Sequence, residues 1–142
     1  MRRYLQYSAS IVGLLGLTDS IYLTIHHYNA TEVPCGITGG CEQVLTSSYA
    51  EIAGLPLGVY GAIAYFTAFA LAFLSAYGNE LTWKLFGILA TLMAAASCWF
   101  IFVQAYYIHA YCQYCLGSAL TSFTLFVLFL ISLGTNRPQD VA

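Results

Sequence analysis

Charged residues are scarce in this chain of 142 residues: Lys and Arg number four and Asp and Glu six, together 7% of the sequence. With so few ionised groups, the chain has neither a basic face that would bind nucleic acid nor an acidic tract that would bind a cationic partner. Hydrophobic residues instead make up 60% of the chain, and the mean hydropathy is +0.74. This composition is typical of an integral membrane protein and not of a soluble domain.

Four apolar runs are long enough to cross a bilayer, whose core of about 30 Å takes roughly 20 helical residues. They cover about residues 7–28, 57–76, 83–108 and 112–133. The first run is about twice as long as the core of a signal peptide and lacks a small-x-small cleavage site, so we expect it to be retained as a helix. The sequence therefore predicts one integral membrane domain over residues 1–142, an all-α bundle of four transmembrane helices.

The basic residues predict the orientation of these spans. All four of them, Arg2, Arg3, Lys84 and Arg137, fall on one side of the predicted topology. The positive-inside rule makes that side cytoplasmic, so both termini lie inside. We expect a multi-pass protein of a bacterial or archaeal cytoplasmic membrane.

The loop over residues 29–56 then faces outward. Its apolar residues, which include Val44, Leu45, Tyr49 and Ile52, recur at roughly helical spacing. This spacing predicts a short amphipathic helix at the outer face of the bundle.

Four of the five cysteines lie on the predicted outer side, which is oxidising in bacteria and archaea. Cys35 and Cys41 flank a glycine-rich stretch of the loop, and Cys112 and Cys115 form a CxxC pair where the fourth span begins. A helix N-terminus stabilises a thiolate, and a flexible loop lets a second thiol pair approach for exchange. Two other interpretations remain open, a four-sulfur zinc site and static disulfides.

Several segments resemble prokaryotic members of the vitamin K epoxide reductase family. They are "GLTDSIYLTIHHY", "CGITGGC", "CEQVLTSSYAEIAGLPLGVYGAIAYF" and "YCQYCLGSAL", and together they cover nearly the whole chain. The resemblance implies a four-helix bundle that holds a quinone near its outer face, of the ubiquinone, menaquinone or vitamin K type. It also implies that the CxxC pair is the active-site pair.

The resemblance implies a role for each outward cysteine. Carried over by position, Cys35 meets an external dithiol, Cys41 exchanges with Cys112, and Cys115 faces the quinone. Ser47 matches a family position near the quinone and the active cysteines, where a hydroxyl is expected.

Two departures from the family pattern bear on function. Many bacterial members carry a fifth span and a fused thioredoxin-like domain, whereas this sequence ends at Ala142 without either. We therefore expect a separate thioredoxin-fold thiol protein as the partner on the outer side. The vertebrate enzymes place a tyrosine four residues after the CxxC, where this chain has Ala119, so epoxide reduction is in doubt although quinone reduction is not.

The predicted function is that of a quinone-dependent enzyme that generates disulfides. Electrons pass from the partner to the loop cysteines, then to the CxxC pair and on to quinone. The alternatives are a vitamin K quinone or epoxide reductase, and a membrane scaffold without enzymatic activity whose outer disulfides are static.

Aromatic residues near the outer face are candidates for the lining of a quinone pocket. The competing interpretation for each is ordinary packing in the bundle or an interfacial belt. The candidates are Tyr60, Phe66, Trp99, Phe102 and Tyr111.

Asp19 is the one acidic residue well inside a predicted span. Intramembrane carboxylates are costly, which makes this residue a candidate for a proton relay to the quinone. The alternatives are a structural pairing with a neighbouring hydroxyl, such as Ser20 or Thr18, and a position that faces the partly wet outer half of the bundle.

Three histidines lie near the predicted outer interface, His26, His27 and His109. For each histidine, one interpretation is a role in proton exchange or quinone contact, and the other is simple solvation. Cys98 lies in the middle of the third span with no cysteine near it in sequence, and we expect it to be a small buried hydrophobic residue.

Overall fold

The computed structural model describes residues 2–29 and 48–140, with side chains described up to Gly134 except that of Ala50. Four long helices make up most of this part of the chain. They are α1 (Arg2–Tyr28), α3 (Leu57–Ser75), α4 (Glu80–Val103) and α5 (Gln113–Asp140). Shorter elements join them: a 3-10 turn η1 (Ser48–Ala50), strands β1 (Glu51–Ile52) and β2 (Leu55–Pro56), and a π-helical turn η2 (Gln104–Ile108).

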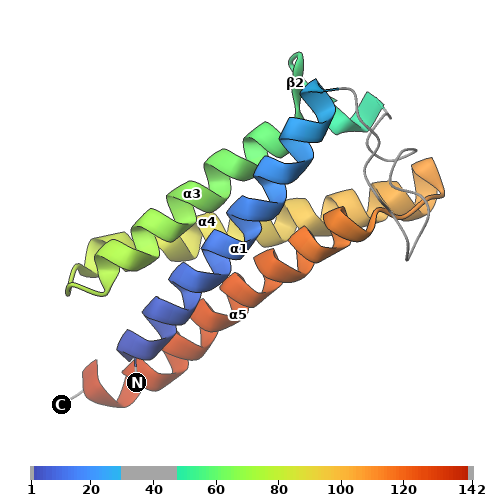
Figure 1. Cartoon of the computed structure of the whole chain (residues 1–142). Coiled ribbons are helices and arrows are strands. Elements are labelled where there is room, and N and C mark those ends of the chain that lie inside the picture. Colours follow the sequence, from blue (N-terminus) through green and yellow to red (C-terminus); the bar gives the residue numbers. More distant parts are fainter. Residues whose placement is uncertain (1, 30–47, 141–142) are drawn as a thin grey trace.

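The four long helices run alongside one another in a single bundle (Figure 1). The two termini lie at one end of the bundle with the connection between α3 and α4, and the β-hairpin and the start of α5 lie at the other end. Each of the four is long and apolar enough to cross a membrane. The predicted membrane bundle of four helices is therefore confirmed, although α1, α4 and α5 extend beyond the predicted apolar runs because a helix continues past the hydrocarbon core into polar sequence.

Local sequence signals set where α3 and α4 begin. Pro56 precedes α3 with an extended backbone, φ −66° and ψ 150°. Asn79 caps α4, because its side-chain oxygen accepts hydrogen bonds from the backbone N–H of Leu81 at 3.1 Å and of Thr82 at 3.4 Å.

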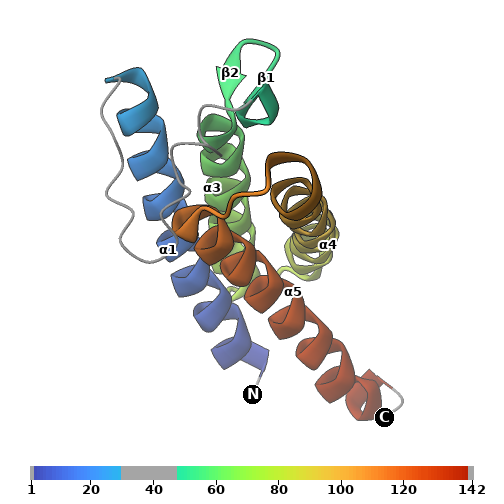
Figure 2. The ribbon, with the colours of Figure 1, turned by 90° about the vertical axis from the view of Figure 1, so that its right-hand side faces the viewer.

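The hairpin replaces part of the amphipathic helix predicted in the loop. Strand β1 pairs antiparallel with β2 through the turn residues Ala53 and Gly54, whose φ angles are 54° and 82°. Two successive residues with positive φ are the requirement of a type I′ turn, which sets the hairpin. Helical structure is present at Ser48–Ala50, but the expected continuation to Ile52 is wrong, since Ile52 pairs with Leu55. Figure 2 shows the hairpin above the first turn of α3.

Close packing of α1 against α3 depends on residues without side chains. Gly16 of α1 faces the ring of Tyr65, and a Cβ at this position would overlap that ring. Tyr65 and the adjacent Ala68 and Ala72 are almost completely buried and belong to the main core cluster. Small residues at a helix contact let two backbones approach closely, which is how membrane helices associate without a strong hydrophobic force.

The contact between α4 and α5 combines aromatic packing with a buried hydrogen bond. The Trp83 ring stacks on Phe86 with centroids 4.7 Å apart, and its indole N–H donates to the Ser132 hydroxyl at 2.9 Å. Gly87 leaves the space that the Phe129 ring fills. The buried indole is therefore both packed and satisfied in hydrogen bonding.

Large apolar side chains also cover the outside of the bundle, as expected for a surface in lipid. Ile63 is 62% exposed, Leu92 63% and Leu120 68%. Cys98 lies on this exposed surface as well. The prediction that it is buried is wrong, because its position in α4 faces away from α3 and α5, on which α4 packs.

Candidate active site

The CxxC pair lies at the end of the bundle that carries the hairpin, where α5 begins. Cys112 directly precedes α5, and its carbonyl accepts the Leu116 N–H at 2.9 Å, so it occupies the N-cap position. Its sulfur accepts the backbone N–H of Cys115 at 3.4 Å, as a capping side chain does. Cys112 is fully buried and Cys115 half-buried, and both are free thiols.

The two sulfurs have different electrostatic environments. The pKa of the Cys112 thiol is lowered to about 7, mainly because the Cys115 thiol donates a hydrogen bond to its sulfur. The backbone N–H groups of Cys115 and Tyr114 lower this pKa further, against the opposing effect of burial. Cys112 therefore ionises more readily than an ordinary thiol, while Cys115 supplies the proton of the hydrogen bond.

A buried glutamine holds the N-cap cysteine in place. The Gln104 side-chain oxygen accepts the Cys112 N–H at 3.0 Å, and its backbone carbonyl accepts the Ala110 N–H at 3.2 Å. Gln104 opens the π-helical turn η2, and His109, with φ 59°, reverses the chain after it. Gln104 was not among the residues predicted from the sequence, although a signal was present, because it is the one amide side chain within the predicted third span.

A hydroxyl cluster lies one turn further along α5. The Tyr65 hydroxyl donates to the Ser118 carbonyl at 2.6 Å and lies 2.9 Å from the hydroxyls of both Ser118 and Ser122. The Tyr65 ring crosses from α3 past Gly16 of α1 to reach them. Three helices therefore meet directly below Cys115, at a point that no sequence pattern indicates.

Asp19 lies on α1 next to this cluster. Its Oδ2 atom is buried and has no hydrogen-bond partner among the described residues. Its charge acts on Tyr65, Cys112 and Cys115. The predicted pairing with Thr18 is not what the structure shows, since the Thr18 hydroxyl donates to the Leu14 carbonyl.

The histidines occupy different settings at the hairpin end. The His26 ring packs on Tyr22 at 4.3 Å, and Tyr22 in turn contacts Tyr114 of α5 at 5.4 Å. His27 Nε2 lies 3.2 Å from Glu51 Oε1 and connects α1 to the hairpin. His26 is therefore linked to the cysteine pair through aromatic contacts, whereas His27 is linked to the loop.

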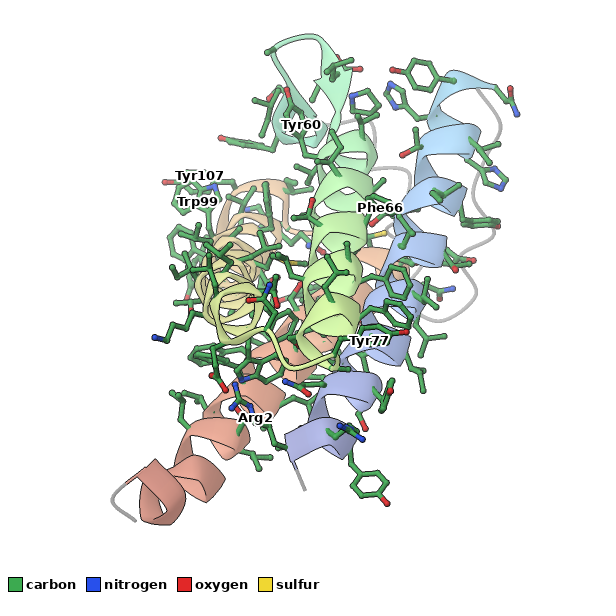
Figure 3. The ribbon with its side chains drawn as sticks, turned by 90° about the vertical axis from the view of Figure 1, so that its left-hand side faces the viewer. Arg2, Tyr60, Phe66, Tyr77, Trp99 and Tyr107 are labelled. Atoms are coloured by element: carbon green, nitrogen blue, oxygen red, sulfur yellow. The ribbon has the colours of Figure 1, made fainter. Side chains whose placement is uncertain are left out.

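The predicted pocket aromatics fall into separate groups. Trp99 and Phe102 stack on α4 at 5.8 Å, and Phe66 is 58% exposed on α3. Figure 3 shows Trp99 beside α4 and Phe66 on the side of α3 that faces α1. The Tyr60 hydroxyl donates to the Ile52 carbonyl, and Tyr111 is 44% exposed next to the buried Cys112. Their contact with a quinone remains a prediction, as does that of Ser47, which lies outside the described residues with Cys35 and Cys41.

Four membrane-length helices with an ionisable thiol pair at one end define a helical membrane protein equipped for thiol chemistry. The chain matches the vitamin K epoxide reductase family over residues 8–130 and belongs to that family. The resemblance seen in the sequence motifs is thereby confirmed.

A relative in plants indicates the type of chemistry. The chain is 37% identical over 135 residues to the Thiol-disulfide oxidoreductase LTO1 of Arabidopsis thaliana. The match takes in 88% of this chain and 36% of that relative, so the chain spans about a third of the relative's length. The name of that relative describes thiol-disulfide chemistry for the relative itself.

Proposed function

We propose that the protein is a quinone-dependent thiol-disulfide oxidoreductase that forms disulfides in a thioredoxin-fold protein on the outer side of the membrane. The observation that carries the proposal is the unequal pair at the start of α5, with a buried, thiolate-forming Cys112 beside a proton-bearing Cys115. A dithiol enzyme needs this inequality, because one sulfur must exchange with another disulfide while its neighbour resolves the product.

The loop cysteines act first in this scheme. The partner's dithiol reduces the Cys35–Cys41 disulfide and becomes a disulfide itself. The Cys41 thiolate then attacks the Cys112 sulfur of the Cys112–Cys115 disulfide and releases Cys115 as the leaving thiolate. Cys35 displaces Cys112 to close the loop disulfide again, so two electrons have moved to the CxxC pair. Gln104 keeps Cys112 in one orientation for this exchange through its bond to the backbone N–H.

The surroundings of Cys115 fit a lipid-soluble oxidant. Cys115 is half-buried at the start of an apolar helix, and Ala119 one turn below it is buried and has no polar group. A bound quinone would accept the two electrons and two protons that the reduced pair gives up. We expect Tyr111, Ser47 and the other aromatic candidates to contact it, because an apolar pocket with few polar groups is the usual binding site of such a cofactor.

Ala119 also favours quinone over epoxide as the substrate. It is buried in the contact of α5 with its neighbours, so the protein has no hydroxyl at the position where the vertebrate enzymes have tyrosine. We expect little or no epoxide reduction.

The orientation follows from the two ends of the bundle. The N-terminus and the α3–α4 connection lie at the end opposite the cysteine pair (Figure 1). Arg2 and Lys84 belong to that end, which supports placing it in the cytoplasm. The cysteine pair then faces the oxidising side of a bacterial or archaeal membrane.

Turnover by the purified protein tests the function. In lipid nanodiscs with ubiquinone or menaquinone, the protein should oxidise a reduced thioredoxin-fold protein while quinol forms in equal amount. Cys115→Ala should abolish quinol formation, and Cys98→Ala, which changes a lipid-facing thiol, should leave it intact. Unchanged turnover in Cys115→Ala would contradict the proposal.

Trapping the thiols in cells distinguishes the remaining alternatives. Alkylation after acid quenching should show mixed redox states and a disulfide-linked partner. A scaffold with static disulfides would show one locked state, and a zinc site would show copurifying zinc with all four outward cysteines reduced.

A further inference from the structure

A carboxyl group that has no counter-ion among the described residues lies on α1, near the end of the bundle that carries the cysteine pair. Asp19 Oδ2 is buried and receives no hydrogen bond from the described residues. The described ion pairs lie elsewhere: Arg2 binds Glu80 at the opposite end of the bundle, and His27 faces Glu51 at the hairpin. Among the described residues nothing compensates a charge on this oxygen, and Asp19 as a whole is half-buried, so the buried side of the carboxylate bears a desolvation cost.

Asp19 lies three residues from both Gly16 and Tyr22, on the face of α1 that packs against α3 and the start of α5. Gly16 faces the Tyr65 ring, and the Tyr22 ring contacts Tyr114, which lies between the two cysteines in sequence, at 5.4 Å. The titratable groups on this side are Tyr65 of α3 and Tyr114, Cys112 and Cys115 at the start of α5. Tyr65 gives its hydroxyl proton to the Ser118 carbonyl, so it does not serve as a donor to the carboxylate. Among the described residues, the cysteine pair is therefore the group that can exchange a proton with Asp19.

The Asp19 carboxylate and the Cys112 thiolate are both negative and repel each other. The charge of Asp19 raises the pKa of Cys112, against the lowering by Cys115 and the helix N–H groups. Two groups that repel each other in this way titrate as a unit, because ionisation of one disfavours ionisation of the other.

We propose that Asp19 and the cysteine pair share one proton in the reduced protein. Cys112 is a thiolate while Asp19 is a carboxylic acid, and Cys112 is a thiol while Asp19 is a carboxylate. The exchange moves one proton and no electrons, and Cys115 keeps its own proton in both forms.

During turnover, Asp19 holds a proton next to the cysteine pair that can be passed to the quinone; this step rests on the proposed function. Oxidation of the pair from its thiolate form releases two electrons but only the one proton of Cys115. Asp19 supplies the second proton that a quinone requires and regains one from the next dithiol. Protons and electrons then balance over a cycle, and the bundle carries one negative charge throughout, on Cys112 or on Asp19.

Titration of the Cys112 thiolate tests the shared proton directly. Its ultraviolet absorbance is followed against pH in the reduced full chain with the other three cysteines, Cys35, Cys41 and Cys98, replaced by Ala, and with Cys112→Ser added as the blank. Asp19→Asn should raise the thiolate population at about pH 6 roughly two- to fourfold, because the opposing charge is gone. Asp19→Glu should restore the parent profile, and Glu51→Gln, which removes an exposed acidic charge on the same side, should not change it. Superimposable profiles for the parent and Asp19→Asn overturn the proposal.

Infrared spectroscopy follows the carboxylic acid carbonyl band of Asp19 against pH in the reduced chain and gives a second readout. Because ionisation of Cys112 disfavours ionisation of Asp19, part of this band should persist to pH values at which the Cys112 thiolate is already present, and in Cys112→Ser the band should be lost at lower pH. The same pH dependence of the band in the parent and in Cys112→Ser contradicts the shared proton. Neither measurement uses quinone or partner, so absence of quinone turnover with an intact exchange would refute the proposed function alone.

Discussion

Cys112 and Cys115 belong to one short motif, yet they are different chemical groups. Cys112 is fully buried, and its sulfur accepts hydrogen bonds from the thiol and the backbone of Cys115. Cys115 is more accessible and acts as donor. The assignment of Cys112 to exchange and Cys115 to the quinone side agrees with this inequality and remains a prediction.

The ionisation of Cys112 should make its reactivity depend on pH. Because its pKa is lowered to about 7, the thiolate persists down to neutral pH and disappears as the pH falls below it. An unperturbed thiol loses its thiolate already below about pH 8.5. Alkylation rates of Cys112, followed by mass spectrometry, should therefore rise to a plateau just above neutrality. In Cys115→Ala the main hydrogen bond is lost, and the plateau should move to higher pH; an unmoved plateau would be evidence against the thiol-to-thiolate bond.

Gln104 should matter for stability as well as for the site. Gln104→Met keeps the shape of the side chain but leaves the buried Cys112 N–H without its acceptor, which costs about 1–3 kcal/mol. We expect a lower unfolding temperature in detergent and slower exchange at Cys112. Gln104→Glu retains an oxygen acceptor and should lose less stability than the methionine variant; equal losses would contradict the role of this hydrogen bond.

At the scale of elements, α1, α3 and α5 are joined at one point by the Tyr65 side chain. Its ring lies against Gly16 of α1, and its hydroxyl bonds to Ser118 and Ser122 of α5. The spacing of α1 from α3 therefore decides whether the hydroxyl reaches α5.

Gly16→Ala should destabilise the bundle. The added methyl overlaps the Tyr65 ring, and overpacking of this kind costs about 1–3 kcal/mol. The matched control is Gly117→Ala in α5, where no other atom lies within 4 Å of the new Cβ, so its better helix propensity should leave stability unchanged or higher. Chemical unfolding in mixed micelles compares the two. Equal stabilities for both variants would show that the α1–α3 contact adjusts without cost.

For the whole molecule, the bundle has a charged end and a thiol end. The Arg2 guanidinium bonds the Glu80 carboxylate at 2.6 Å at the charged end, where it joins α1 to α4. The hairpin and the cysteine pair lie at the other end (Figure 1). The two compartments on either side of the membrane therefore meet chemically different surfaces of the protein.

Labelling of single cysteines in intact cells tests which end faces outward. Tyr77 lies exposed in the α3–α4 connection, and Ala53 lies exposed in the hairpin turn. In a background without native cysteines, Ala53→Cys should react with a membrane-impermeant maleimide, whereas Tyr77→Cys should react only after the cells are opened. Labelling of Tyr77→Cys in intact cells would reverse the proposed orientation.

Much of the fold could be predicted from the sequence, and less of the site. The four helices follow from apolar length, and the CxxC pair was expected at the start of the last helix. The hairpin at Ile52 was missed, because its apolar residues also fit a helical stripe. Cys98 was expected to be buried, but an apolar residue in a membrane helix faces lipid as readily as the core.

The amino-acid sequence alone determined the number of spans and placed both termini at one end, because these follow from apolar length and from the position of a few charges. The thiol pair could be predicted for the same reason, since it is a local motif. Only the tertiary structure decided which sulfur is the thiolate, since that depends on the cap geometry and on Gln104, which η2 and the turn at His109 bring to the start of α5. It also decided that Tyr65 bonds α5, across a sequence separation of 53 residues, and that Asp19 faces the pair. Contacts of this kind depend on how helices pack, and packing distances are not encoded in any single stretch of sequence.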